Sequence, residues 1–214
     1  MPRTPEPGDA TPWLPARRTL AALRTAAQGC RGCPLWRDAT RTVFGEGPRR
    51  AELMLVGEAP GDAEDRVGRP FVGPAGGLLD RALTDAGIDR VLVYITNAVK
   101  HFGFAHARGM RLHKSPQAAH INACRPWLVA EVAAVRPQVI VALGAVAARA
   151  VCGRPVTIAA VRGRVIDAAL GRVVVTTHPS ALLRLREHDE REQAFALLVR
   201  DLRMAHDAIS AGQH

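Results

Sequence analysis

The chain has 214 residues, of which 48% are hydrophobic and 23% charged, a composition typical of a globular protein rather than a disordered one. No apolar run approaches the roughly 18 residues that cross a bilayer, and the Pro-rich N-terminus lacks the apolar segment of a signal peptide, so we expect a cytoplasmic protein without a membrane span. The net charge of +9 and the isoelectric point of about 10.8 favour a polyanionic partner; a solvated basic surface is the alternative.

Capping residues and apolar patterns predict the elements in chain order. Residues 1–15 are expected to form a flexible Pro-rich tail, followed by one domain over residues 16–210. Helices are predicted over residues 14–27, 76–86, 117–135, 145–151 and 187–209. Apolar runs without alternation, typical of parallel strands buried on both faces, occupy residues 53–56, 91–95, 139–143 and 173–175. This alternation predicts an α/β fold with three α/β/α layers and a central, mainly parallel four-stranded sheet.

Polar side chains follow three of the predicted strands. Glu58 and Asp62 come after the first strand, Asn97 after the second and His178 after the fourth. In an open parallel sheet, ligands bind at the carboxyl ends of the strands, where these loops converge. The four side chains are therefore expected to meet in one site although they are far apart in the sequence.

Cysteine usage points to a metal or redox site. Four cysteines are too few for a secreted disulfide scaffold. The pair Cys30 and Cys33, spaced as CxxC, therefore favours a metal site over a redox pair. Further candidate ligands are Cys124, Cys152, His101 and His120. Such donors hold zinc or an iron–sulfur cluster, and their spacing does not decide between the two. The alternatives are a CxxC turn without metal and a Cys152 that is a small buried apolar residue.

Four motifs occur in a fixed order along the chain: GEAPG at 57–61, GRPFVGPAG at 68–76, ITN at 95–97 and HPSALLR at 178–184. In this order they resemble the iron–sulfur uracil-DNA glycosylases, over roughly residues 28–205. Within that superfamily, NAVKHF at 97–102 and RLHKSP at 111–116 resemble the UdgX group. Members of that group are similar to the type-4 enzymes but carry an inserted basic loop, whose final histidine becomes joined to the abasic sugar.

The resemblance implies a [4Fe–4S] cluster held by Cys30, Cys33 and Cys124. Type-4 enzymes have a cysteine where this chain has His101, so His101 is implied as the fourth ligand, with Cys152 as the alternative. A histidine ligand tends to raise the reduction potential of a cluster. The implied role of the cluster is structural, because it would fix the loops that grip DNA.

The resemblance also implies roles for the residues at the strand ends. Phe71 would stack on a flipped uracil, and the Asn97 amide would pair with its O4 and N3–H edge. His178 would stabilise the charge that develops at uracil O2. Glu58 would stabilise the sugar cation or orient the attacking group, assisted by Asp62. Backbone approach to the base or a phosphate would use Gly57, Ala59 and Gly61. Taken singly, each of these residues also suits a core, turn or loop role.

His113 distinguishes two outcomes of the reaction. A neutral imidazole at the sugar C1′ would attack the cation before water does and leave the protein joined to DNA. The alternative is that His113 contacts a phosphate. The chain departs from the UdgX pattern twice, with Gly-Met-Arg-Leu-His in place of Lys-Arg-Arg-Ile-His and with Ala59 in place of glutamine. Residues expected to bind the DNA backbone are Arg108, Arg111, Lys114, Ser180 and Arg184.

The sequence thus predicts a monomeric DNA-repair enzyme that flips and excises uracil, prefers single-stranded DNA and becomes linked to the abasic site through His113. One alternative is a glycosylase that turns over with water as nucleophile. Another is a non-catalytic DNA-binding module with a metal-stabilised basic face, which would bind without preference for uracil. A nucleotide-phosphate hydrolase is disfavoured, because the loop at 57–61 lacks the lysine of a P-loop.

Overall fold

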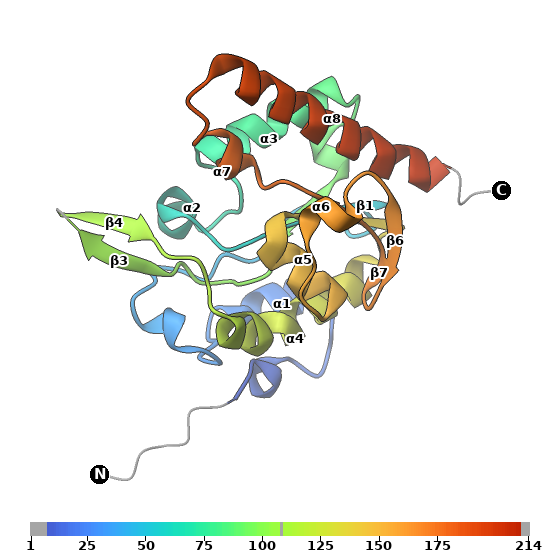
Figure 1. The fold of residues 1–214 in the computed structure, drawn as a ribbon. Coiled ribbons are helices and arrows are strands. Elements are labelled where there is room, and N and C mark those ends of the chain that lie inside the picture. Colours follow the sequence, from blue (N-terminus) through green and yellow to red (C-terminus); the bar gives the residue numbers. More distant parts are fainter. Residues whose placement is uncertain (1–7, 108, 211–214) are drawn as a thin grey trace, which may run out of the picture.

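The computed structural model describes residues 8–107 and 109–210, and Figure 1 shows a central sheet between two layers of helices. The sheet has five strands in the order β2-β1-β5-β7-β6; the first four are parallel, and β6 is antiparallel to β7. These strands are β1 (Leu53–Gly57), β2 (Tyr94–Asn97), β5 (Val139–Leu143), β6 (Val165–Ala168) and β7 (Gly171–Thr176). The predicted three-layer α/β architecture is confirmed.

Helices cover both faces of the sheet (Figure 1). One layer holds α1 (Leu20–Ala27), α4 (Ala118–Val135) and α5 (Gly144–Cys152), and the other holds α3 (Pro74–Asp85) and α8 (His188–Ser210). The shorter elements are α2 (Asp62–Val67), α6 (Ile158–Val161), α7 (Pro179–Leu182) and 3-10 turns over Thr11–Trp13, Pro34–Arg37 and Arg90–Leu92. None of the helices in the described ranges is both long and apolar enough to cross a membrane.

The core explains why the strands lack polar alternation. Successive side chains of a strand point to opposite faces of the sheet. In β1, Met54 and Val56 enter the core under α1, α4 and α5, whereas Leu53 and Leu55 enter the core under α3 and α8. Since both faces are buried, both sets of side chains are apolar.

The number of strands and the start of two elements differ from the prediction for local reasons. The sheet has five strands rather than four, because β6 is a half-exposed edge strand that needs no continuous apolar run. β2 begins at Tyr94 rather than at residue 91, since the Asp89 side chain caps a 3-10 turn ahead of it. α1 begins at Leu20 rather than at residue 14, because Thr19 Oγ1 accepts a backbone hydrogen bond at its N-terminus at 3.3 Å.

The predicted basic loop is a two-stranded antiparallel hairpin of β3 (Phe104–Ala107) and β4 (Met110–His113). It projects from the body of the molecule beside α2 (Figure 1). Residues that face each other across the hairpin share a side, so Phe104 and His113 lie on the same side as His106 and Arg111. The opposite side carries only alanine, methionine and leucine side chains.

Part of the predicted tail packs against the domain. The Ala10 N–H donates to the carbonyl of Ala123 on α4 at 2.8 Å, and Ala10 is only 1% exposed. Residues 11–13 continue as a 3-10 turn. The flexible segment predicted for residues 1–15 therefore does not extend over residues 10–13, and residues 1–7 lie outside the described ranges.

Candidate active site

The carboxyl ends of the parallel strands bring Asn97 and Phe71 together over Gly57. Asn97 and Gly57 are register partners at the ends of β2 and β1. A Cβ atom on Gly57 would lie 2.6 Å from Phe71 Cζ and would also collide with Asn97 Oδ1. Glycine is therefore required here, since both side chains lie directly on its main chain.

Phe71 forms one wall of the site in an unusual backbone conformation. Its φ is +56°, a left-handed value that bulky residues rarely adopt and that often marks functional sites. Its ring stacks on the His178 ring with centroids 5.9 Å apart and an interplanar angle of 29°. The two rings thus stand together beside the Asn97 amide.

The His178 imidazole is neutral and has a defined tautomer. Its Nδ1 accepts the Ser180 N–H at 3.1 Å and lies 2.9 Å from Ser180 Oγ. The proton of the neutral ring is therefore on Nε2. Burial lowers the pKa of His178 to about 4, and the nearby charges of His113 and Arg184 act in the same direction. The His178 side chain lies over Gly144, the residue directly after β5. A Cβ atom added to Gly144 would lie 3.1 Å from the Cβ atom of His178.

Glu58 and His113 face each other across the site, with His113 Nε2 3.9 Å from Glu58 Oε1. This oxygen is buried and has no hydrogen-bond partner within the described part of the chain. The His113 ring stacks on Phe102, with centroids 5.9 Å apart, and its side chain is 34% exposed. A buried free carboxylate oxygen beside a reachable imidazole suits a reaction in which positive charge develops between them.

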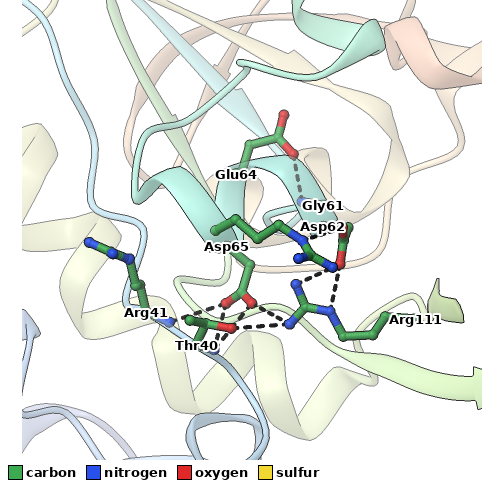
Figure 2. A network of polar contacts seen from close by, with 8 residues as sticks. Thr40, Arg41, Gly61, Asp62, Glu64, Asp65 and Arg111 are labelled. Carbon is green, nitrogen blue, oxygen red and sulfur yellow. Dashed lines mark hydrogen bonds and ion pairs between the residues drawn. The ribbon is translucent and has the colours of Figure 1, made fainter.

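Arg111 ties the hairpin to α2, as Figure 2 shows. Its guanidinium contacts Asp62 Oδ1 at 2.5 Å, Asp65 Oδ2 at 2.7 Å and Thr40 Oγ1 at 3.1 Å. Asp65 is fully buried and also accepts the backbone N–H groups of Thr40 and Arg41. Asp62 also pairs with Arg66, and Arg66 and Arg111 together hold the pKa of its carboxyl below the usual range.

Glu64 joins two loops beside these side chains. Its Oε2 accepts the Gly61 N–H at 3.1 Å, a contact drawn in Figure 2, and its Oε1 accepts the Gly73 N–H at 2.9 Å. The loop with Gly73 also carries Phe71. The importance of Glu64 and Asp65 was not predicted, and the available signal was the cluster of acidic residues in the first turn of α2.

The structure brings Glu58, Asn97 and His178 to one end of the sheet, as the strand pattern predicts, and Phe71 and His113 lie there with them. Asp62, predicted to meet the same group, pairs with Arg66 and Arg111 instead. The residues expected to bind DNA have different surroundings. Lys114 and Arg184 are exposed, whereas the Arg111 guanidinium is paired inside the molecule. Ser180 orients His178, and Arg108 lies outside the described ranges.

A family model for the uracil DNA glycosylase superfamily matches residues 44–203. The chain belongs to this superfamily. It is 43% identical to the type-4 uracil-DNA glycosylase of Thermotoga maritima over 76% of this chain and 82% of that protein. It is 36% identical to the type-4 enzyme of Pyrobaculum aerophilum, over 77% and 85% of the two chains. Identity to the type-4 enzyme of Archaeoglobus fulgidus is 37%, over 76% and 84%.

Three thiols, those of Cys30, Cys33 and Cys124, lie near one another. Trp127 Nε1–H donates to Cys30 Sγ at 3.2 Å, and the Lys100 N–H donates to Cys124 Sγ at 3.3 Å. Burial raises the pKa of Cys124 to about 12; Lys100 acts against this rise, and the nearby Cys33 and Cys30 thiols act with it. The described side chains include no group of three His, Cys, Asp or Glu close enough to hold a single metal ion.

His101 has a nitrogen lone pair available on the buried side of this region. The Thr42 hydroxyl donates to Ala27 O at 3.1 Å, so it accepts from His101 Nε2, 2.9 Å away. The lone pair is consequently on Nδ1, and burial lowers the His101 pKa to about 4 and keeps the ring neutral. His120 instead uses Nδ1 to cap α4, and Cys152 ends α5 near the charge of Arg154.

Proposed function

We propose that this protein flips uracil out of DNA, excises it, and is then joined to the abasic sugar through His113, as in the UdgX group that segments 97–102 and 111–116 resemble. The observation that carries the second part is the Glu58–His113 pair, whose Oε1 and Nε2 atoms lie 3.9 Å apart. Single-stranded DNA is the preferred partner, because flipping an unpaired base costs less.

Base recognition uses the three side chains around Gly57. The flipped uracil stacks on Phe71, and the Asn97 amide donates to O4 and accepts from N3–H. When the N-glycosidic bond breaks, its electron pair leaves with the base, which becomes an anion. His178, neutral and protonated on Nε2, donates a hydrogen bond to the charge at O2.

Capture of the sugar uses the two groups on the other side of C1′. The Glu58 carboxylate stabilises the cation electrostatically. The His113 imidazole adds a nitrogen lone pair to C1′, so a C–N bond forms, the positive charge moves onto the ring, and the second ring nitrogen releases its proton to solvent. In the alternative reaction, water takes the place of the imidazole and the enzyme turns over.

The deciding experiment mixes purified protein with a labelled single-stranded oligonucleotide that contains one deoxyuridine. On a denaturing gel we expect a uracil-dependent protein–DNA band, which disappears in His113→Ala while free uracil is still released. His106→Ala is the matched control, because His106 lies on the same side of the hairpin, and it should retain the band. Uracil release without any band from the wild-type protein would establish water as the nucleophile. If the wild-type protein released no uracil, the alternative of a non-catalytic DNA-binding module would take the place of the proposed function.

The donor set fits a [4Fe–4S] cluster held by Cys30, Cys33 and Cys124 with His101 Nδ1, and bound there it would join the segment after α1 to α4. We expect Cys124→Ser to lose iron and acid-labile sulfide and to lower the midpoint of thermal unfolding. Cys152→Ser is the control and should keep both. Loss of iron in Cys152→Ser instead would make that thiol the fourth ligand.

A further inference from the structure

A lysine is completely buried directly behind the residue that faces the base. Lys100 is 0% exposed, and its ammonium donates to Thr96 Oγ1 at 2.7 Å, to the Asn97 carbonyl at 2.7 Å and to Glu131 Oε2. All three ammonium protons therefore have partners. The chain uses arginine for every other basic residue except Lys114. A compact ammonium suits three acceptors around one point, whereas a planar guanidinium does not.

Glu131 on α4 completes the cluster. It is 0% exposed, and its Oε1 accepts the hydroxyls of Tyr94 and Thr96 at 2.9 Å each and the Gly45 N–H at 3.2 Å. Burial and the negative charge of Glu131 raise the pKa of Tyr94, which stays a donor. A buried pair with every partner satisfied stays fixed, because moving either charge would leave the other unpaired.

The pair lies on the side of β2 opposite to the base site. Tyr94 and Thr96 point toward α4, so the Asn97 side chain, one residue on, points to the other face and lies over Gly57. The Asn97 carbonyl oxygen accepts a hydrogen bond from the Lys100 ammonium, while the side-chain amide of Asn97 faces the base. The Lys100 ammonium thus fixes the main chain at Asn97, the residue whose side-chain amide reads the base.

We propose that Lys100 and Glu131 are positioning residues that set the preference for uracil by fixing the Asn97 main chain from the opposite face of the sheet. This inference rests on the proposed function, in which Asn97 reads the base. Charged neighbours held in one place keep the amide's donor and acceptor in register with uracil, and cytosine presents the reverse pattern at the same edge.

A matched pair of single substitutions tests the proposal. Thr96→Val and Tyr94→Phe each remove one hydroxyl that lies 2.9 Å from Glu131 Oε1, but only Thr96 also contacts Lys100. The readout is the ratio of dissociation constants for single strands carrying non-cleavable 2′-fluoro-deoxyuridine or 2′-fluoro-deoxycytidine. We expect Thr96→Val to lower this ratio about tenfold, since the bond from the Lys100 ammonium is lost, and Tyr94→Phe to leave it within about twofold, since Lys100 keeps all its partners.

The double variant Lys100→Met/Glu131→Gln removes both buried charges and so leaves neither unpaired. We expect its uracil preference to fall about a hundredfold, the usual effect of a displaced contact of this kind. In single-turnover excision, the protein concentration at half-maximal rate should rise more than the maximal rate falls. The single variant Lys100→Arg should also lose the preference for uracil, because a planar guanidinium does not suit the three acceptors.

The outcomes separate the two levels of the proposal. If the wild-type protein binds both strands equally, the proposed function fails. If the wild-type protein prefers uracil and Thr96→Val matches Tyr94→Phe, the positioning role is wrong, whether or not the double variant folds.

Discussion

At the scale of single residues, hydrogen bonds to neighbours fix which nitrogen of two neutral imidazoles is protonated. Nδ1 of His178 accepts from Ser180, so the nitrogen that faces outward is a donor. Nε2 of His101 donates to Thr42, so its other nitrogen is an acceptor. The first arrangement suits a negative charge on a leaving base, and the second suits a metal ligand.

The His178 tautomer leads to a pH prediction. A folded-state pKa of about 4, below the ordinary value of about 6.5, means that His178 stays neutral at every pH above about 5. Single-turnover uracil release by His113→Ala, which keeps the burial that is the main cause of the shift, should stay flat from pH 8 to about 5 and fall at lower pH. Stability carried by this group is present above pH 6.5 and is lost as the pH falls toward 4. A rate inflection near pH 6.5 would contradict the assignment.

Gly57 gives the sharpest steric prediction. A methyl group at Gly57 collides with Phe71 and Asn97, so Gly57→Ala should lower the rate of uracil excision about a hundredfold, measured in a single turnover. Gly77 on α3 is the matched control, because a Cβ there meets nothing within 4 Å. Gly77→Ala should keep full activity and raise the stability by about 0.5–1 kcal/mol. Equal losses in both variants would remove the steric argument.

At the scale of elements, the short helix α2 connects four separate segments at the site. Glu64 holds the loops at Gly61 and Gly73, and Asp65 holds the segment after the CxxC turn. Asp65 and Asp62 together hold Arg111 of the hairpin. We infer that Arg111 orients the hairpin and its histidine rather than binding a phosphate.

Loss of this connection should affect capture more than excision. Arg111→Gln is expected to reduce the yield of the joined protein–DNA species about tenfold and to change uracil release by less than about twofold. Arg66→Gln is the control, since Arg66 also pairs with Asp62 but has a side chain that is 66% exposed. Parallel losses of capture and release in Arg111→Gln would instead indicate a general role in DNA binding.

The elements also show how far the sequence alone could lead. The four parallel strands and the residues at their ends were predictable, because burial on both faces leaves continuous apolar runs. The hairpin was predicted as a loop, since its exposed strands carry no such run. The Lys100–Glu131 and Arg111–Asp65 pairs could not be predicted. Their residues are 31 and 46 positions apart, respectively, and meet only in the finished fold.

At the scale of the whole molecule, the net charge of +9 implies DNA binding that weakens with salt. Lys114 and Arg184 are exposed near the site, so Lys114→Met and Arg184→Met should each reduce the slope of log K against log salt for single strands by about 0.7. Arg111→Gln should leave the slope unchanged, because its guanidinium is already paired within the protein. Filter binding at several salt concentrations measures this, and a reduced slope in Arg111→Gln would show that its side chain reaches a phosphate.

Strand β1 ends at Gly57 and β5 is followed directly by Gly144, and each glycine lies under a side chain from the neighbouring strand or from the loop after it. Asn97 from β2 lies over Gly57, and His178 after β7 lies over Gly144. At these two positions the site therefore rests on main chain, and its shape depends on both residues being glycine. A Cβ atom at Gly57 displaces Asn97 and Phe71, and a Cβ atom at Gly144 displaces His178. The two glycines thus keep the recognition side chains in place by leaving room for them.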